Sequence, residues 1–89
     1  MFTIYTSSLN SHRDVHKKTG LIQHILGAHS IQYHTVDVCS IDSIPSFLKG
    51  HHIYPILGWK TLLIADYDEI QELEDMNSLS SFLSYFKDH

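Results

Sequence analysis

Cysteine, proline and basic residues are all scarce in this sequence of 89 residues. Cys39 is the only cysteine, so an intramolecular disulfide is impossible, which suits a reducing compartment. Six basic residues against ten acidic ones give a net charge of −4. This balance disfavours a nucleic-acid partner, because neutralising phosphates requires a basic face. We find no low-complexity tract, internal repeat or linker, and we expect one domain spanning residues 1–89.

Long apolar runs are also missing. The longest, residues 62–65, is far too short to cross a bilayer, and no basic stretch followed by an apolar one suggests a secretion signal. We therefore expect a cytoplasmic protein without membrane contact. The apolar fraction of 43% and the charged fraction of 18% are typical of an ordinary globular domain, and a chain of this length supports a single core.

The N-terminal half has the pattern of a strand, a helix and a second strand. Residues 2–6 are aromatic and β-branched, as in a pleated strand, and residues 31–38 have similar strand propensity. Between them, Ser11 and Asp14 have capping-box spacing, and Gly27 is the expected helix end. Because a helix joins them, the two strands are expected to be parallel neighbours. The apolar residues that share one face of this helix are Val15, Ile22, Ile25 and Leu26.

A short helix is expected next, over the residues that follow the second strand. Asp42 or Ser43 provides its cap, since both side chains accept hydrogen bonds from free backbone N–H groups. Gly50 is its expected end, because glycine is favoured where a helix terminates. Phe47 and Leu48 are its expected contacts with the core.

A hairpin and two helices complete the predicted domain. Residues 56–57 and 61–65 are apolar runs joined by a turn at residues 58–60, so we expect an antiparallel pair. Asp68, with Gln71 three residues later, predicts the cap of the next helix. The expected inward residues are Ile70, Leu73 and Met76 in that helix, and Leu79, Phe82, Leu83 and Phe86 in a last one beginning at Asn77 or Ser78.

The predicted order of elements is β-α-β-α-β-β-α, an α/β fold with a mixed four-stranded sheet flanked by helices. Five short motifs occur along it: Thr6-Ser7-Ser8, Val15-His16-Lys17-Lys18, Val36-Asp37-Val38, Asp66-Tyr67-Asp68 and Ser81-Phe82-Leu83. The order of elements is that of thioredoxin-like proteins of the glutaredoxin type. With these motifs the chain resembles the Src-homology-3-domain-binding glutamic-acid-rich protein family.

The resemblance implies a glutaredoxin-like fold that has lost its redox cysteines, and hence a non-catalytic protein-binding module. In redox proteins of this shape the loop after the first strand carries the reactive cysteines, whereas here it reads Ser7-Ser8-Leu9-Asn10-Ser11-His12. The resemblance also implies a cis peptide bond before Pro55. Residues 51–55 stand where the family has its proline-rich stretch, and they contain one proline, so the PxxP motif that Src-homology-3 domains bind is absent.

As a functional hypothesis, the former active site is a groove that recognises a peptide or protein, without catalysis, cofactor or metal. The alternative is a glutathione-binding or weakly thiol-active enzyme, because Tyr54-Pro55 is retained where glutaredoxins hold glutathione. Ala65 and Asp66 replace the glycine pair of that site, and the Asp66 carboxylate would oppose an anionic ligand. A third possibility is a domain that only dimerises, although we expect a monomer or weak dimer. The candidate groove consists of Ser7, Ser8, Leu9, Asn10, Tyr54, Pro55, Ala65 and Asp66.

Two further features have both a structural and a functional interpretation. Cys39 is expected just past the second strand, on the far side of the first helix's connection, where an incidental role is favoured over a redox role. Residues 66–75 contain six acidic residues and no basic one. This is typical of a solvated helix start, but it also predicts a docking face for a basic partner, formed by Asp68, Glu69 and Glu72.

Eight histidines and one tryptophan complete the candidates. His12 and His16 have i, i+4 spacing, and His51-His52 are adjacent. A metal site needs three or four convergent ligands, which the spacing does not provide, so surface histidines are expected. Trp59 is expected at the hairpin tip, either as an exposed contact residue or packed beneath its neighbour Lys60.

Overall fold

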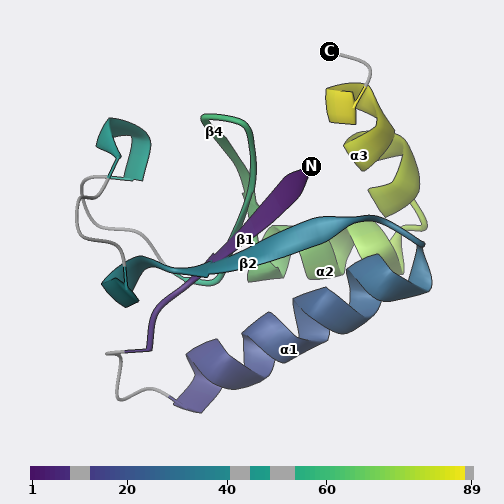
Figure 1. The fold of residues 1–89 in the computed structure, drawn as a ribbon. Helices are drawn as coiled ribbons and strands as arrows, with labels where there is room; N and C mark the ends of the chain where they lie inside the picture. The colour runs from purple at the N-terminus through teal and green to yellow at the C-terminus, as the bar shows by residue number, and fades with distance from the viewer. Residues whose placement is uncertain (9–12, 41–44, 49–53, 88–89) are drawn as a thin grey trace.

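A computed structural model of the chain describes residues 1–8, 13–40, 45–48 and 54–87 (Figure 1). In these residues the fold is α/β, with a mixed four-stranded sheet and three α-helices. None of these helices combines the length and the apolar composition that crossing a bilayer requires. The elements in chain order are β1 (Phe2–Thr6), α1 (Arg13–Ala28), β2 (Tyr33–Asp37), the 3₁₀ turns η1 (Val38–Ser40) and η2 (Ser46–Leu48), β3 (Ile56–Trp59), β4 (Leu62–Asp66), α2 (Tyr67–Asp75) and α3 (Leu79–Lys87).

β1 lies inside the sheet, whose strand order is β2-β1-β3-β4. It runs parallel to β2, with Phe2 opposite Tyr33 and Thr6 opposite Asp37, and antiparallel to β3. The unit formed by β1, α1 and β2 therefore has the predicted parallel pairing. As a consequence, the carboxyl ends of β1 and β2 meet at one edge of the sheet, and β3 starts at that same edge.

The two faces of the sheet are packed differently. Alternating residues of β1 point to opposite faces, so Phe2 and Ile4 face the α-helices, whereas Tyr5 faces away from them. All three helices contribute to the main core and lie on one face of the sheet (Figure 1). The buried members of this core are Phe2, Ile4, Ile22, Leu26, Leu57, Ala65, Ile70, Leu79 and Leu83.

A second, smaller core lies on the other face. Tyr5, Val38 and Leu48 are buried in it, and the Phe47 ring meets the Tyr5 ring edge-on, with centroids 5.9 Å apart. Phe47 and Leu48 thus contact the core as predicted. They belong to the 3₁₀ turn η2 and not to an α-helix, while the expected caps and end of that helix lie outside the described residues, as does Ser11.

The start of α2 differs from the prediction. Asp66 is the N-cap, its carboxylate accepts the Glu69 N–H, and the Glu69 carboxylate accepts the Asp66 N–H in return. The predicted cap, Asp68, is already inside the helix because β4 runs into α2 without an intervening loop. Ile70 is buried as predicted, but Met76 is 61% exposed, since α2 ends at Asp75 and Met76 already belongs to the connection to α3.

Removing the capping carboxylate tests this assignment. We expect Asp66→Ala to lower the free energy of unfolding by about 1 kcal/mol, because the Glu69 N–H loses the side-chain oxygen that accepts its hydrogen bond. Asp66→Asn keeps a side-chain acceptor and is expected to lose much less. Urea denaturation followed by circular dichroism measures both. Equal losses for the two variants would contradict the capping role.

The hairpin is longer than the sequence pattern indicates. β3 continues to Trp59 and the turn is formed by Lys60 and Thr61, with Lys60 at a φ of 58°. A two-residue turn allows the strands to pair up to Trp59 and Leu62. The Trp59 ring packs on Phe2 with ring centroids 4.6 Å apart. Trp59 is therefore a half-buried strand residue, and the prediction that placed it in the turn is wrong.

Candidate functional site

The edge where β1 and β2 end brings together groups from two distant parts of the sequence. The Ser7 hydroxyl lies 3.2 Å from the Cys39 sulfur. One carboxylate oxygen of Asp37 accepts the Ser8 N–H at 3.1 Å and the Cys39 N–H at 3.0 Å. The expectation that Cys39 lies away from this loop is therefore wrong. The cysteine follows β2, and the parallel register puts the end of β2 beside the end of β1.

Asp37 is the group that ties the two strand ends together. Hydrogen bonds hold the pKa of the Asp37 carboxyl below its usual range. The bond from the Ser8 hydroxyl has the largest effect, followed by the bond from the Cys39 backbone N–H. An ionised carboxylate accepts several hydrogen bonds at once, so its negative charge suits this position. The result is a compact arrangement of polar groups around the exposed thiol of Cys39.

The Asp37 pKa gives a prediction for the response to acid. Because the pKa is lowered in the folded state, the stabilisation is present above the unfolded value and is lost as the pH falls through the folded value. Carbon-detected NMR should find the Asp37 pKa below that of an unfolded chain, with the amide signals of Ser8 and Cys39 titrating alongside. Asp37→Asn should abolish that titration, and Asp14→Asn on α1 should leave it unchanged. An ordinary Asp37 pKa would contradict the prediction.

Tyr54 and Pro55 lie next to the start of α2, as the groove hypothesis requires. Their peptide bond is cis, which the family resemblance implied. Both residues line a small pocket of about 40 Å³ together with Asp66 from the end of β4. Burial raises the pKa of the Tyr54 hydroxyl, and the charge of the Cys39 thiolate raises it further. The remaining lining residues are Lys18, Tyr67 and Asp68.

The predicted groove residues are thus divided between three environments. Tyr54, Pro55 and Asp66 share the pocket, whereas Ser7 and Ser8 lie at the strand edge with Cys39 and Asp37. Ala65 belongs to the main core, where it is 4% exposed, so its side chain faces the helices. Leu9 and Asn10 lie outside the described residues.

The predicted acidic docking face is also divided. Asp68 lines the pocket beside Tyr54 and Pro55. Glu69 and Glu72 border a separate groove of about 300 Å³ between α2 and α3. The apolar residues that line it are Leu73, Met76 and Phe82.

Of the histidines in the described residues, His16, His24 and His34 are exposed and His29 is half-buried. His29 contacts both carboxylate oxygens of Glu74 at 3.0 Å, which joins the end of α1 to α2. Within the described ranges, no three histidine, cysteine or acidic side chains converge as metal ligands would. His12, His51 and His52 lie outside those ranges.

Lys18 and Tyr67 are site residues that the sequence reasoning missed. The Lys18 ammonium lies 5.2 Å from the centre of the Tyr67 ring, within reach of a cation–π interaction, and both residues line the pocket. Helix α1 is held to β1 nearby, where the hydroxyls of Thr6 and Thr19 lie 2.8 Å apart. Lys18, the residue before Thr19, therefore lies near this edge of the sheet. This position results from tertiary packing, which the spacing of apolar residues along the helix did not indicate.

Comparisons with known proteins add no assignment to this geometry, since neither a protein-family model nor a curated protein matches the chain.

Proposed function

We propose that the chain is a non-catalytic, glutaredoxin-like binding module of the cytoplasm that recognises a protein or peptide segment. The observation that carries this proposal is the pocket in which Tyr54 and Pro55 meet the start of α2 and the Lys18 ammonium. The β1–α1–β2 unit followed by a hairpin and helices is compatible with the thioredoxin-like fold. The absence of cysteine from the sequence of the β1–α1 connection supports binding in preference to redox catalysis.

The size of the pocket favours a segment of a larger ligand. A volume of about 40 Å³ admits a small side chain, since a single water molecule needs about 10–15 Å³. Sites that enclose a whole small molecule are far larger, at about 300–1,000 Å³. A peptide lying across this edge would place one side chain against Tyr54 and Pro55, with its main chain outside.

The charged residues of the pocket indicate which residues of the bound peptide lie on either side of the inserted side chain. Lys18 offers one cation, while Asp66 and Asp68 offer two carboxylates at the start of α2. Asp66 is occupied as the helix cap, so Asp68 is the carboxylate better able to meet a ligand. We therefore expect a small apolar side chain with an acidic residue on the Lys18 side and a basic one on the Asp68 side.

The experiment is an NMR titration with short synthetic peptides that carry valine or alanine between acidic and basic flanks. Saturable shifts at Lys18, Tyr54 and Tyr67 are expected, and swapping the flanks should weaken them. Lys18→Met should reduce binding, whereas Lys17→Met, an exposed neighbour outside the pocket, should not. No saturable shift in the pocket with any flank order, or equal loss in the two lysine variants, would contradict the proposal.

A second candidate function is weak thiol chemistry at Cys39. The exposed sulfur beside Ser7 favours it, because the thiol lies at the edge of the sheet where β1 and β2 end. The test is a disulfide-reduction assay with glutathione as the reductant, comparing the protein with Cys39→Ser and Ser7→Ala. Turnover that disappears in Cys39→Ser would support an enzyme. Glutathione shifts at the pocket without turnover would support binding alone.

A further inference from the structure

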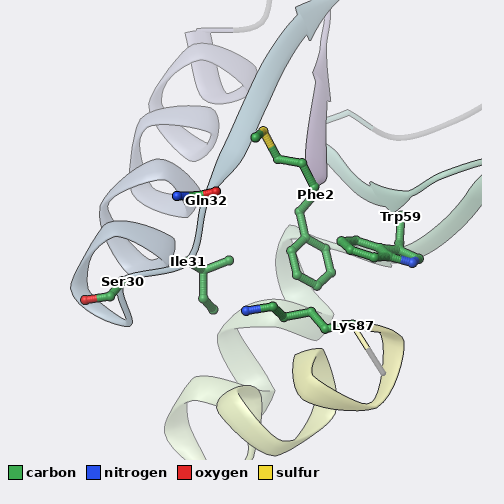
Figure 2. A pocket seen from close by; sticks show the side chains of 7 residues that line it. Phe2, Ser30, Ile31, Gln32, Trp59 and Lys87 are labelled. Carbon is green, nitrogen blue, oxygen red and sulfur yellow. The ribbon is translucent and has the colours of Figure 1, made fainter. Parts of the chain in front are cut away.

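A second cavity lies at the opposite end of the sheet from Tyr54 and Pro55. It has a volume of about 500 Å³, which is within the range of small-molecule sites. It opens where β1 and β2 begin and β3 ends, beside the last turn of α3 (Figure 2). Its lining residues are Met1, Phe2, Ser30, Ile31, Gln32, Trp59 and Lys87.

One wall of this cavity is apolar and rigid. Phe2 is almost fully buried, and the Phe2 and Trp59 rings pack at an interplanar angle of 51°. Ile31 continues the apolar surface on the other side of Phe2 (Figure 2). Because Phe2 and Trp59 are paired residues of neighbouring strands, the sheet itself holds the wall in place. An alkyl chain or an aromatic ring packs well on such a surface.

The polar side chains of the cavity include hydrogen-bond donors, and Lys87 carries a positive charge. Lys87 extends beneath the Phe2 ring with its ammonium toward Ile31, and the Gln32 amide lies across the cavity from it (Figure 2). The lining includes no carboxylate, and Lys87 has no ion-pair partner among the described residues. Lys87 therefore brings a positive charge to the cavity, on a chain whose net charge is −4.

We propose that this cavity binds a monocarboxylate with an alkyl or aryl body. Its carboxylate accepts hydrogen bonds from the Lys87 ammonium and the Gln32 amide, and its body packs on the half-buried side chains of Ile31 and Trp59. The residues that line the cavity include no arginine, whose planar guanidinium is a common partner of phosphate groups, whereas a lysine ammonium beside an amide suits a carboxylate. The site is independent of the proposed peptide groove, because the two lie at opposite ends of β1.

Trp59 is the sole tryptophan, so its fluorescence reports on this cavity. The probes are octanoate and phenylacetate, with octanol and octylammonium as matched controls, all below the concentration at which micelles form. We expect a saturable change in Trp59 emission with both carboxylates, weaker binding of octanol and no response to octylammonium. Equal affinity for octanoate and octylammonium would overturn the proposal, because the charge would then not be recognised.

Variants assign the binding to Lys87. Lys87→Met keeps the apolar stem and removes the charge, so octanoate affinity should fall about tenfold to a hundredfold while octanol affinity stays unchanged. Lys17→Met, an exposed lysine on α1, should leave both affinities unchanged. Equal octanoate affinity in Lys87→Met and the parent, or octanoate-induced NMR shifts that gather at exposed Leu62 or Met76 rather than at Phe2 and Ile31, would overturn the proposal.

Discussion

Ile4→Ala is expected to lower the free energy of unfolding by about 2–5 kcal/mol. Ile4 is in the middle of the inner strand β1, opposite Thr35 on β2 and Leu57 on β3, and its side chain is 0% exposed. Truncation removes packing against the core that all three helices share, and the surrounding strands leave little room for collapse into the cavity. Domains of this kind have about 5–15 kcal/mol of stability in total, so the loss is a large part of it.

The matched control is Leu62→Ala on β4. Leu62 is 57% exposed, so its truncation leaves no enclosed cavity and is expected to change stability by about 0.5 kcal/mol or less. Urea and thermal denaturation of the two variants beside the parent give the comparison. Similar losses for Ile4→Ala and Leu62→Ala would mean that the interior packing around β1 is not as described.

Helices and strands could be predicted from the sequence wherever the residue pattern that defines the element lies within one continuous segment. The alternation in β1 and the spacing of Val15, Ile22 and Leu26 in α1 each encode which side faces the core, and all three helix residues are buried. The cap of α2 could not be predicted as readily. Two aspartates, Asp66 and Asp68, both fit a capping pattern, and the choice depends on where β4 stops pairing with β3.

The candidate site also depends on contacts between distant segments, which the sequence does not specify directly. Tyr54, Pro55 and Asp66 were expected together because a family resemblance supplied the tertiary arrangement, and the structure places them in one pocket. Cys39 was assigned to the wrong place, although parallel pairing of Thr6 with Asp37 would have put it beside Ser7. Only the register of the sheet determines that neighbour, and register is a property of two distant segments.

The second large effect is expected at Gly58, in the middle of the hairpin. A Cβ atom there would lie 2.8 Å from Cε2 of the Tyr5 ring and 3.1 Å from the Leu62 carbonyl oxygen. The Tyr5 ring has little freedom to move away, because it is buried in the second core against Phe47. We expect Gly58→Ala to destabilise the protein by about 1–3 kcal/mol, since a packed neighbour must shift to admit the methyl group.

Gly20→Ala is the matched control, and its effect should have the opposite sign. Gly20 is exposed on α1 with no atom within 4 Å of its added Cβ, so alanine is expected to stabilise the helix by about 0.5–1 kcal/mol. Urea denaturation of both variants gives the sign of each change in the free energy of unfolding. Combining Gly58→Ala with Tyr5→Leu should cost less than the sum of the single changes, because the smaller side chain relieves the overlap. Additive losses, or stabilisation by Gly58→Ala, would exclude the close approach of Tyr5 to β3 as the reason for glycine at this position.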